Sequence, residues 1–248
     1  MTPTLLAIVA ASFFVAGTVK GITGMGLPLV GMGLLSLAMP PVTAASLMIA
    51  PALVTNVLQC LGPHFRRLAL LLGPLWIGVF IGCWFTPFPS LTDGGSVVRI
   101  LLGVVLIAYS AYGLARPTFK LHLHGGPRTV AVTSVVGLTT GMMTAATGIN
   151  IFPMTIFLQA LGFEREEMIQ ALGLSFTVCT IALAVSLGWH AASGTWSTAA
   201  GWIALVAAFA GVGVGNLLRA RIEPAVFRRM LFALFGLLGI AMIAKELA

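Results

Sequence analysis

Charged residues are scarce in this chain. Only 8% of its 248 residues are Asp, Glu, Lys or Arg, whereas 59% are hydrophobic. An ordinary soluble domain has about 25% charged residues, so the composition excludes a soluble globular fold. Long apolar runs separate the few charges, and the mean hydropathy is +1.07. Because backbone groups in lipid must be hydrogen-bonded internally, this pattern predicts an all-α, polytopic membrane protein.

Carboxylates are rarer still. The six are Asp93, Glu164, Glu166, Glu167, Glu223 and Glu246. We expect all of them outside the membrane spans, with Glu166 and Glu167 in a solvated helix start at the edge of segment 166–189. Carriers that bind a proton or cation through a membrane carboxylate need Asp or Glu in their spans, as do metal-dependent membrane enzymes. The sequence also lacks HExxH and GxSxG motifs, and its three cysteines have no CxxC spacing. We therefore expect no catalytic residues, no metal site, no cofactor and no enzymatic activity.

Positive charge exceeds negative charge, with a formal net charge of +7. In a soluble protein this excess would suggest binding to nucleic acid. Here, however, the Arg and Lys residues stand at the ends of apolar runs, where they indicate membrane topology. We expect the lipid bilayer as a partner and no nucleic acid.

Eight apolar segments are long enough to form helices. Their approximate ranges are 4–38, 42–62, 68–87, 97–115, 129–160, 166–189, 197–218 and 225–244. Six of them fit one membrane crossing of about 20 residues. The segments 4–38 and 129–160 are too long for one crossing and too short for two, and glycine, threonine and proline interrupt both. We expect these two segments to be discontinuous helices or re-entrant hairpins.

The two halves of the chain resemble each other in their spacing of glycines. A polar linker, 117–128, separates a first transmembrane repeat, 1–116, from a second, 129–248. The matching glycines are Gly17 and Gly137, Gly21 and Gly141, and Gly24 and Gly148. Their shared order indicates a duplication of the chain.

The positions of the basic loops differ between the two halves. In the first half, Arg66 and Arg67 follow the second apolar segment, whereas the matching loop of the second half, 190–197, contains no Arg or Lys. The next loop of the second half contains Arg219 and Arg221. Because short cytoplasmic loops are enriched in basic residues, this change predicts inverted-topology repeats with a cytoplasmic linker and both termini outside. Secondary transporters often have this architecture, with the substrate near the bilayer midplane between broken helices.

Lys20 is the one basic residue far from both ends of an apolar segment. An ammonium group in a membrane costs several kcal/mol unless it is compensated, and a bound anion is the expected compensation. Helix ends at the neighbouring glycines would direct further backbone N–H groups at such an anion. The alternative is that Lys20 reaches a membrane interface beside a helix that ends at Gly21.

Residues around the two interruptions, most of them polar residues or glycines, complete the candidate substrate-binding set. They are Thr23, Gly24, Met25 and Gly26 in the first half, Thr144, Thr147, Gly148 and Asn150 in the second, and Asn56 and Thr180 on the segments that follow. The alternative for the threonines is a hydrogen bond to the carbonyl four residues earlier, and small residues also serve helix packing. Asn56 and its neighbours Thr55 and Gln59 should face the protein interior, either lining the site or joining helices.

His64 and His190 occupy matching places at the ends of helical segments. A titratable imidazole there would couple transport to pH. The alternative is that both residues simply lie at the membrane interface.

The stretch Gly17-x-x-x-Gly21-Ile22-Thr23-Gly24-Met25-Gly26 resembles the first glycine-rich motif of the sulfite exporter TauE/SafE family. Pro28, residues 39–44 and Asn56 extend this resemblance, and its second-half counterpart runs through Gly137, Gly141, Gly148 and Pro153. Ala145, Ala146 and Asn150 stand where glycines are common in the family. The resemblance covers nearly the whole chain. It implies a carrier in the bacterial inner membrane for sulfite, sulfonates, sulfoacetate or similar small anions.

The sequence thus favours a secondary transporter that binds a small anion and works by alternating access. An anion channel with a continuous pore would use the same hydrogen-bond donors. A third alternative is a membrane subunit that has no ligand. A second copy of the chain, forming a homodimer, is a further candidate partner.

Overall fold

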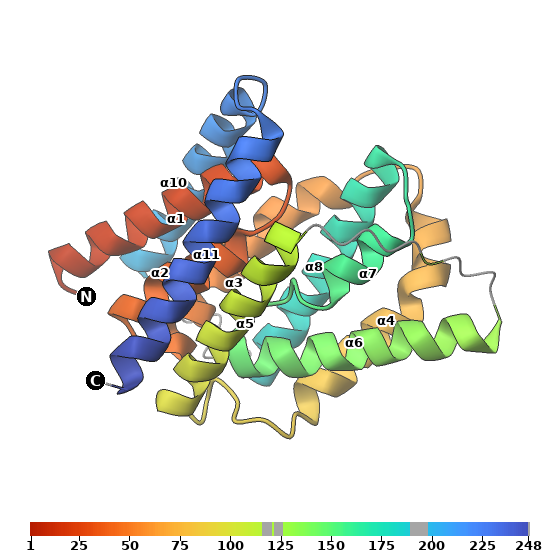
Figure 1. Ribbon diagram of the computed structural model, residues 1–248, viewed down its shortest axis with the longest axis horizontal. Coiled ribbons are helices and arrows are strands. Elements are labelled where there is room, and N and C mark those ends of the chain that lie inside the picture. Colours follow the sequence, from red (N-terminus) through yellow and green to blue (C-terminus); the bar gives the residue numbers. More distant parts are fainter. Residues whose placement is uncertain (116–120, 122–125, 189–197, 248) are drawn as a thin grey trace.

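The computed structural model describes residues 1–115, 121, 126–188 and 198–247, and this part of the chain is helical with no strand (Figure 1). The all-α prediction is therefore confirmed. The first-half helices are α1 (Pro3–Thr23), α2 (Leu27–Ala38), α3 (Pro41–Cys60), α4 (Phe65–Trp84) and α5 (Ser96–Ala115). The second-half helices are α6 (Pro127–Thr147), α7 (Met154–Ala160), α8 (Arg165–Ser186), α10 (Ala199–Leu218) and α11 (Pro224–Leu247).

Seven of these helices are long and apolar enough to cross a membrane: α1, α4, α5, α6, α8, α10 and residues Ala225–Leu247 of α11. The chain is thus a multi-pass membrane protein. The segments 4–38 and 129–160 are each divided into a long and a short helix, α1 and α2 in the first and α6 and α7 in the second, and α1 and α6 have 21 residues each. At 1.5 Å per residue such a helix is about 30 Å long, enough to cross the hydrocarbon core. The short members are α2 and α7.

The ends of α1 and α6 have the same local structure. Gly24 has φ +80° and its N–H donates to the Lys20 carbonyl, while Gly148 has φ +72° and its N–H donates to the Thr144 carbonyl. Gly26, which precedes α2, has φ +100°. Glycine adopts this left-handed conformation without the steric cost of a Cβ, so it ends both helices at the interruptions seen in the sequence. That these segments re-enter the bilayer remains a prediction.

The same helix packing occurs twice in the molecule. α1 lies beside α10, and α6 lies beside α4 (Figure 1). A Cβ on Gly17 would lie 2.3 Å from the carbonyl oxygen of Ala208, and one on Gly137 would lie 2.0 Å from that of Leu75. One turn later Gly21 meets Val212, and Gly141 meets Val79. The matched glycines therefore let both helix pairs touch through their backbones, as small residues do in membrane bundles.

Two further helix pairs complete the bundle. α5 and α11 run antiparallel, with the Arg99 guanidinium 2.7 Å from the Glu246 carboxylate at one end and the Ser110 hydroxyl 2.6 Å from the Phe232 carbonyl nearer the other. α3 packs against α8, where the buried Gln170 donates to the carbonyls of Cys60 and Gly62 and accepts from the backbone N–H of His64. Gln170 thereby fixes the α3–α4 turn.

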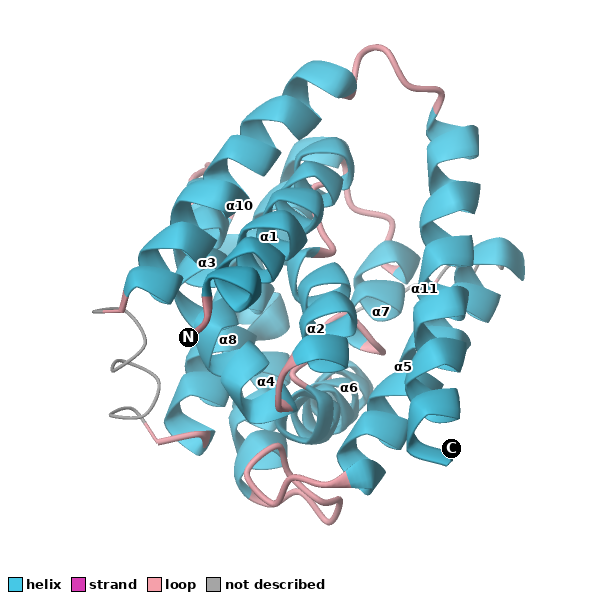
Figure 2. Cartoon of the chain, turned by 90° about the vertical axis from the view of Figure 1, so that its left-hand side faces the viewer, coloured by secondary structure: helices cyan, strands magenta, loops and turns pink. Residues whose placement is uncertain are grey.

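The α10–α11 connection and the α4–α5 connection lie at opposite ends of the bundle (Figure 2). The first contains Arg219 and Arg221, and we call its side of the bundle the basic end. The second contains Asp93, and we call its side the acidic end. Arg67 at the start of α4 also lies at the basic end, where it pairs with Glu167 of α8 at 3.1 Å.

Glu166 and Glu167 lie in the first turn of α8, and Glu246 lies near the end of α11. Both helices are candidate spans, so the expectation that every carboxylate lies outside the spans is wrong for these three, and Glu167 is buried and not solvated. Glu167 and Glu246 each have an arginine partner, which offsets the cost of removing the carboxylate from water.

The glycine contacts lead to a prediction about stability. We expect Gly78→Ala in α4 to lower the melting temperature by several degrees, because its methyl group would lie 2.5 Å from the Ser134 carbonyl oxygen, and overpacking typically costs about 1–3 kcal/mol. Gly73→Ala is the matched control on the same helix, since no atom lies within 4 Å of its added Cβ. Thermal unfolding of the purified variants in detergent measures both effects. Equal melting temperatures would contradict the close packing of α4 and α6.

Candidate functional site

Lys20 lies on the last turn of α1 and is only 5% exposed. Its ammonium group donates to the Thr55 hydroxyl, 2.9 Å away, and to the side-chain oxygen of Asn56, both on α3. The Thr55 hydroxyl in turn donates to the Pro51 carbonyl at 2.6 Å, so it serves Lys20 as an acceptor. Within the described residues no carboxylate pairs with Lys20. Its charge is therefore buried among neutral acceptors.

The turn after α1 is fixed by its own side chains and by α3. The Thr23 hydroxyl lies 2.8 Å from the Val19 carbonyl and 2.7 Å from the Met25 carbonyl, and it accepts the Met25 N–H. Gln59 of α3 donates to the Gly24 carbonyl at 2.8 Å. The structure thus brings Lys20, Thr23, Gly24 and Asn56 together from the predicted set, and Gln59 and Thr55 face inward with them.

The second-half candidates are also buried, but their hydroxyl protons are already used. Thr144 donates to the Thr140 carbonyl, Thr147 to that of Met143 and Thr180 to that of Phe176, all at 2.6–2.7 Å. These are the bonds within a helix that the packing alternative predicts.

Asn150 differs from those threonines, because its side-chain oxygen is buried and has no partner in the described part of the chain. Gly148 lies against Met32. Among the described residues no hydrogen bond joins Asn56 to Thr180 or joins the first-half set to the second-half set.

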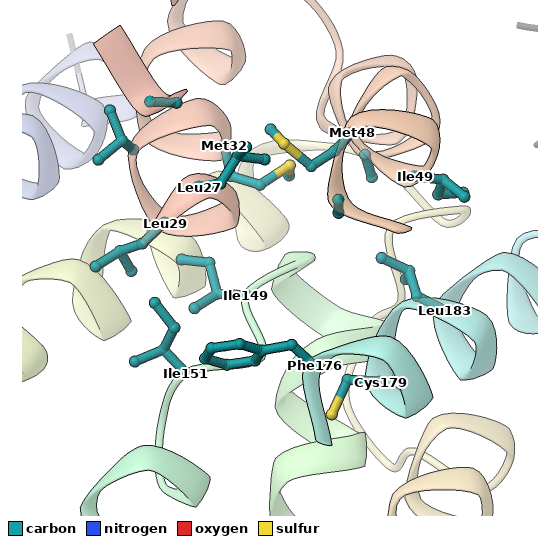
Figure 3. Packing of buried hydrophobic residues seen from close by; sticks show 14 of the residues in the cluster. Leu27, Leu29, Met32, Met48, Ile49, Ile149, Ile151, Phe176, Cys179 and Leu183 are labelled. Carbon is teal, nitrogen blue, oxygen red and sulfur yellow. The ribbon is translucent and has the colours of Figure 1, made fainter. Parts of the chain in front are cut away.

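Apolar side chains occupy the space between the two interruptions. Figure 3 shows Leu27, Leu29 and Met32 of α2 facing Ile149 and Ile151, which follow α6, with residues of α3 and α8 beside them. All five are at most 1% exposed. In this conformation the middle of the protein is therefore a closed apolar cluster.

A cavity of about 480 Å³ opens at the basic end of the bundle. It reaches Thr23, Met25 and Gly26 at the α1–α2 turn, and Arg165, Arg219 and Arg228 also line it. No carboxylate lines it, and no ion pair to these three arginines exists within the described residues. This cavity, which we call the arginine cavity, is therefore suited to an anion.

The three arginines are absent from the predicted binding set. Arg219 and Arg228 carry the topology signal in the sequence, and Arg165 follows an acidic residue at a helix start. They come from the ends of α8, α10 and α11, and no local pattern indicates that these ends meet. The available signal in the sequence was the predicted position of the basic loops on one side of the membrane.

The two histidines proposed for coupling are described unequally. His64 precedes α4 and, with Gln59 and Glu166, lines a smaller cavity of about 210 Å³ at the basic end. His190 lies outside the described residues.

A second polar cavity, of about 290 Å³, lies at the opposite end of the bundle and is lined by Ser90, Thr92, Asp93 and Ser186, among others. Hydrogen bonds from the backbone N–H and the hydroxyl of Ser90 hold the pKa of Asp93 below its usual value. Leu29 and Ile151 of the apolar cluster line the arginine cavity, and the two cavities have no described lining residue in common.

Comparison with known proteins identifies the family. No curated protein and no solved structure is significantly similar to the chain. The sequence profile of the sulfite exporter TauE/SafE family matches residues 9–242, nearly the whole length. Members of this family are membrane transporters, which fits the expectation of a transport protein without enzymatic activity. The glycine motifs at the ends of α1 and α6 and the matched profile together show that the chain belongs to the sulfite exporter TauE/SafE family.

Proposed function

We propose that this protein is a secondary transporter of small organic or sulfur-containing anions of the sulfite, sulfonate or sulfoacetate type. The anion enters the arginine cavity and binds near the bilayer midplane, between the turns that end α1 and α6. The observation that carries the proposal is a set of positive charges without negative partners in the part of the chain that the structure describes. Lys20 is buried among neutral groups, and three arginines line a cavity to which no described carboxylate contributes.

Electrostatics favours an anionic ligand at this site. Three arginines on a concave surface raise the local concentration of anions. A buried ammonium group without a counter-ion is costly in a membrane, so an anion that reaches Lys20 gains a charge-assisted hydrogen bond. The Thr55 and Asn56 oxygens, which now accept from Lys20, would be exchanged for that anion.

The apolar cluster favours a carrier over a channel. A channel needs a continuous wet path, whereas Leu27, Met32 and Ile149 are fully buried in the apolar cluster and line neither of the two cavities. Alternating access would open this cluster to one side at a time.

Repeated packing supports inverted repeats as the basis of this movement. α1 lies against α10 as α6 lies against α4, with matching glycine contacts. Gly26 after α1 and Ile151 after α6 both line the cavity at the basic end, while Ala145 in the last turn of α6 lines the cavity at the opposite end. The matching glycine contacts support repeats 1–116 and 129–248, joined by 117–128, and we propose that their orientations are inverted.

The repeats and the basic loops predict a topology in the bacterial inner membrane. Arg66 and Arg219 should be cytoplasmic, with Asp93 and both termini on the outer side. We would place single cysteines at positions 66, 93 and 219 in a cysteine-free background and label intact cells with an impermeant thiol reagent. Labelling should occur at 93 only. Labelling of 66 and 219 from different sides would contradict the inverted arrangement.

Flux measurements in proteoliposomes test the transport mechanism. We expect saturable counter-transport of labelled sulfite or a small sulfonate, with Lys20→Met reducing the rate by more than about tenfold, because a hydrogen bond to a charged group contributes ~1.5–3 kcal/mol. The melting temperature should stay unchanged or rise, since an apolar side chain of similar size replaces a buried charge. Arg229→Gln, an exposed arginine outside the arginine cavity, is the control and should transport normally.

Two results would count against this mechanism. A steady anion current without counter-transport would favour the channel. Unchanged flux in Lys20→Met would show that Lys20 is structural and would remove the observation on which the site depends.

A further inference from the structure

α5 and α11 are bound closely to each other and loosely to the other helices. Their backbones touch where a Cβ on Gly239 would lie 2.6 Å from the carbonyl oxygen of Gly103, and Arg99 pairs with Glu246. Apart from this mutual contact, the two helices pack mainly against α2, and α5 also packs against α6. Figure 2 shows them together at one side of the bundle. We call these two helices the α5–α11 pair, and their contacts allow it to move as one body.

The seam between α2 and the α5–α11 pair changes along its length. At the basic end the seam is open, because residues of both sides line the arginine cavity. Further along α2 the seam is closed, since a Cβ on Gly33 would lie 3.2 Å from a methyl group of Leu238 and 3.5 Å from one of Leu106. At the acidic end the Lys245 ammonium donates to the Leu37 carbonyl, 2.8 Å away. The structure is therefore open toward the basic side and closed toward the acidic side along this seam.

Polar contacts hold the α5–α11 pair to the rest of the molecule at a single place. Among the described residues, the bond from Lys245 to Leu37 is the one hydrogen bond that joins α5 or α11 to another helix. The remaining contacts are apolar and non-directional, so they can change without leaving a polar group unsatisfied. Gly94 and Gly95, directly before α5, have φ +66° and +87°, and no atom lies within 4 Å of a Cβ added to either. They provide a hinge at this end of the pair.

The three arginines of the cavity lie on different sides of this seam. Arg228 belongs to α11, whereas Arg165 begins α8 and Arg219 follows α10. Like charges around one cavity repel each other, so these arginines oppose closure of the basic end. An anion bound among them offsets the repulsion and favours the closed arrangement, which is the differential affinity that a ligand needs to shift a conformational equilibrium.

We propose that the α5–α11 pair is the moving gate of this protein and that a bound anion closes it. The pair rocks against α2 about the contact of Gly33 with Leu238. The basic end then closes over the anion, and the acidic end opens as Lys245 leaves the Leu37 carbonyl. This inference rests on the proposed function, because it assigns the movement of alternating access to particular helices.

Distances between spin labels test the gate in the full chain, in phosphatidylcholine nanodiscs and a cysteine-free background. One label pair, at the exposed Ala38 of α2 and Ala244 of α11, spans the seam at the acidic end. We expect two distance populations there, with saturating methanesulfonate increasing the longer one. The control pair, at the exposed Val97 of α5 and Met230 of α11, lies within the moving body. It should give one distance that the anion leaves unchanged.

Variants separate the contact at the acidic end from the repulsion at the basic end. Lys245→Met removes the hydrogen bond to α2, so it should increase the ratio of longer to shorter distances by about two- to tenfold without any anion. Arg228→Gln should shift the ratio in the same direction, because it removes one of the three like charges. Arg229→Gln is the matched control, since Arg229 is exposed and does not line the cavity, and it should leave the ratio unchanged.

Cross-links connect the movement to transport. Leu37→Cys with Lys245→Cys, joined by a short bis-methanethiosulfonate reagent, should stop anion flux into proteoliposomes, and dithiothreitol should restore it. Ser110→Cys with Gly236→Cys is the control within the α5–α11 pair. A Cβ on Gly236 would lie 3.7 Å from that of Ser110, which suits a disulfide, and its formation should leave flux unchanged. Each protein is compared with its own reduced form, so effects of the substitutions themselves cancel.

Each result supports or overturns the gate. A single distance across the seam under all conditions, or a ratio that methanesulfonate and sulfoacetate both leave unchanged, would overturn it. Loss of flux on forming the Ser110–Gly236 disulfide would also overturn it, because the movement would then occur within the pair. Two populations that shift with an anion, in a wild-type protein that transports none, would support the gate and reject the proposed transport function.

Discussion

Direct contact between helix backbones is the constraint on which this structure depends. Gly17 and Gly21 of α1 touch α10, and Gly137 and Gly141 of α6 touch α4, in each case at distances that leave no room for a Cβ. In lipid, helices gain little from burying apolar surface against each other, so close van der Waals contact has to hold them. These contacts hold α1 and α6 in position within the bundle. The turns that follow the two helices are therefore positioned by helix packing.

Charge neutralisation is uneven across the molecule. Glu167 is buried and Glu246 is half-buried, and each is paired with an arginine of a neighbouring helix. Lys20 has only neutral oxygens, and the arginines of the cavity have no acidic partner among the described residues. A membrane protein that had only to fold would gain by pairing or removing such charges. Unpaired positive charges next to a cavity are what the proposed anion binding requires.

Much of the fold was predictable because glycine and hydropathy act locally. The helical segments follow from runs of apolar residues, and the ends of α1 and α6 follow from Gly24 and Gly148, which take the left-handed conformation. The lengths of the two helices within each interrupted segment were harder to predict. The total length of the segment does not show how its residues are divided between the helices. The glycines lie beyond the middle of the segment 4–38, so α1 extends to Thr23 and α2 is short.

The candidate site was only partly predictable, for a physical reason. Lys20 stands out because one ammonium in an apolar segment is costly wherever the chain folds, and the structure does bury it. Thr144 and Thr147 were predicted to bind the substrate. A helix, however, provides each hydroxyl with a carbonyl acceptor one turn earlier, and both hydroxyls donate to that carbonyl. Tyr109 is the reverse case. Nothing in its sequence surroundings distinguishes it, and only the packing of α5 on α11 places this buried residue in the lining of the arginine cavity. Sequence reasoning therefore finds groups whose cost is intrinsic, whereas groups whose function depends on what packs beside them need the structure.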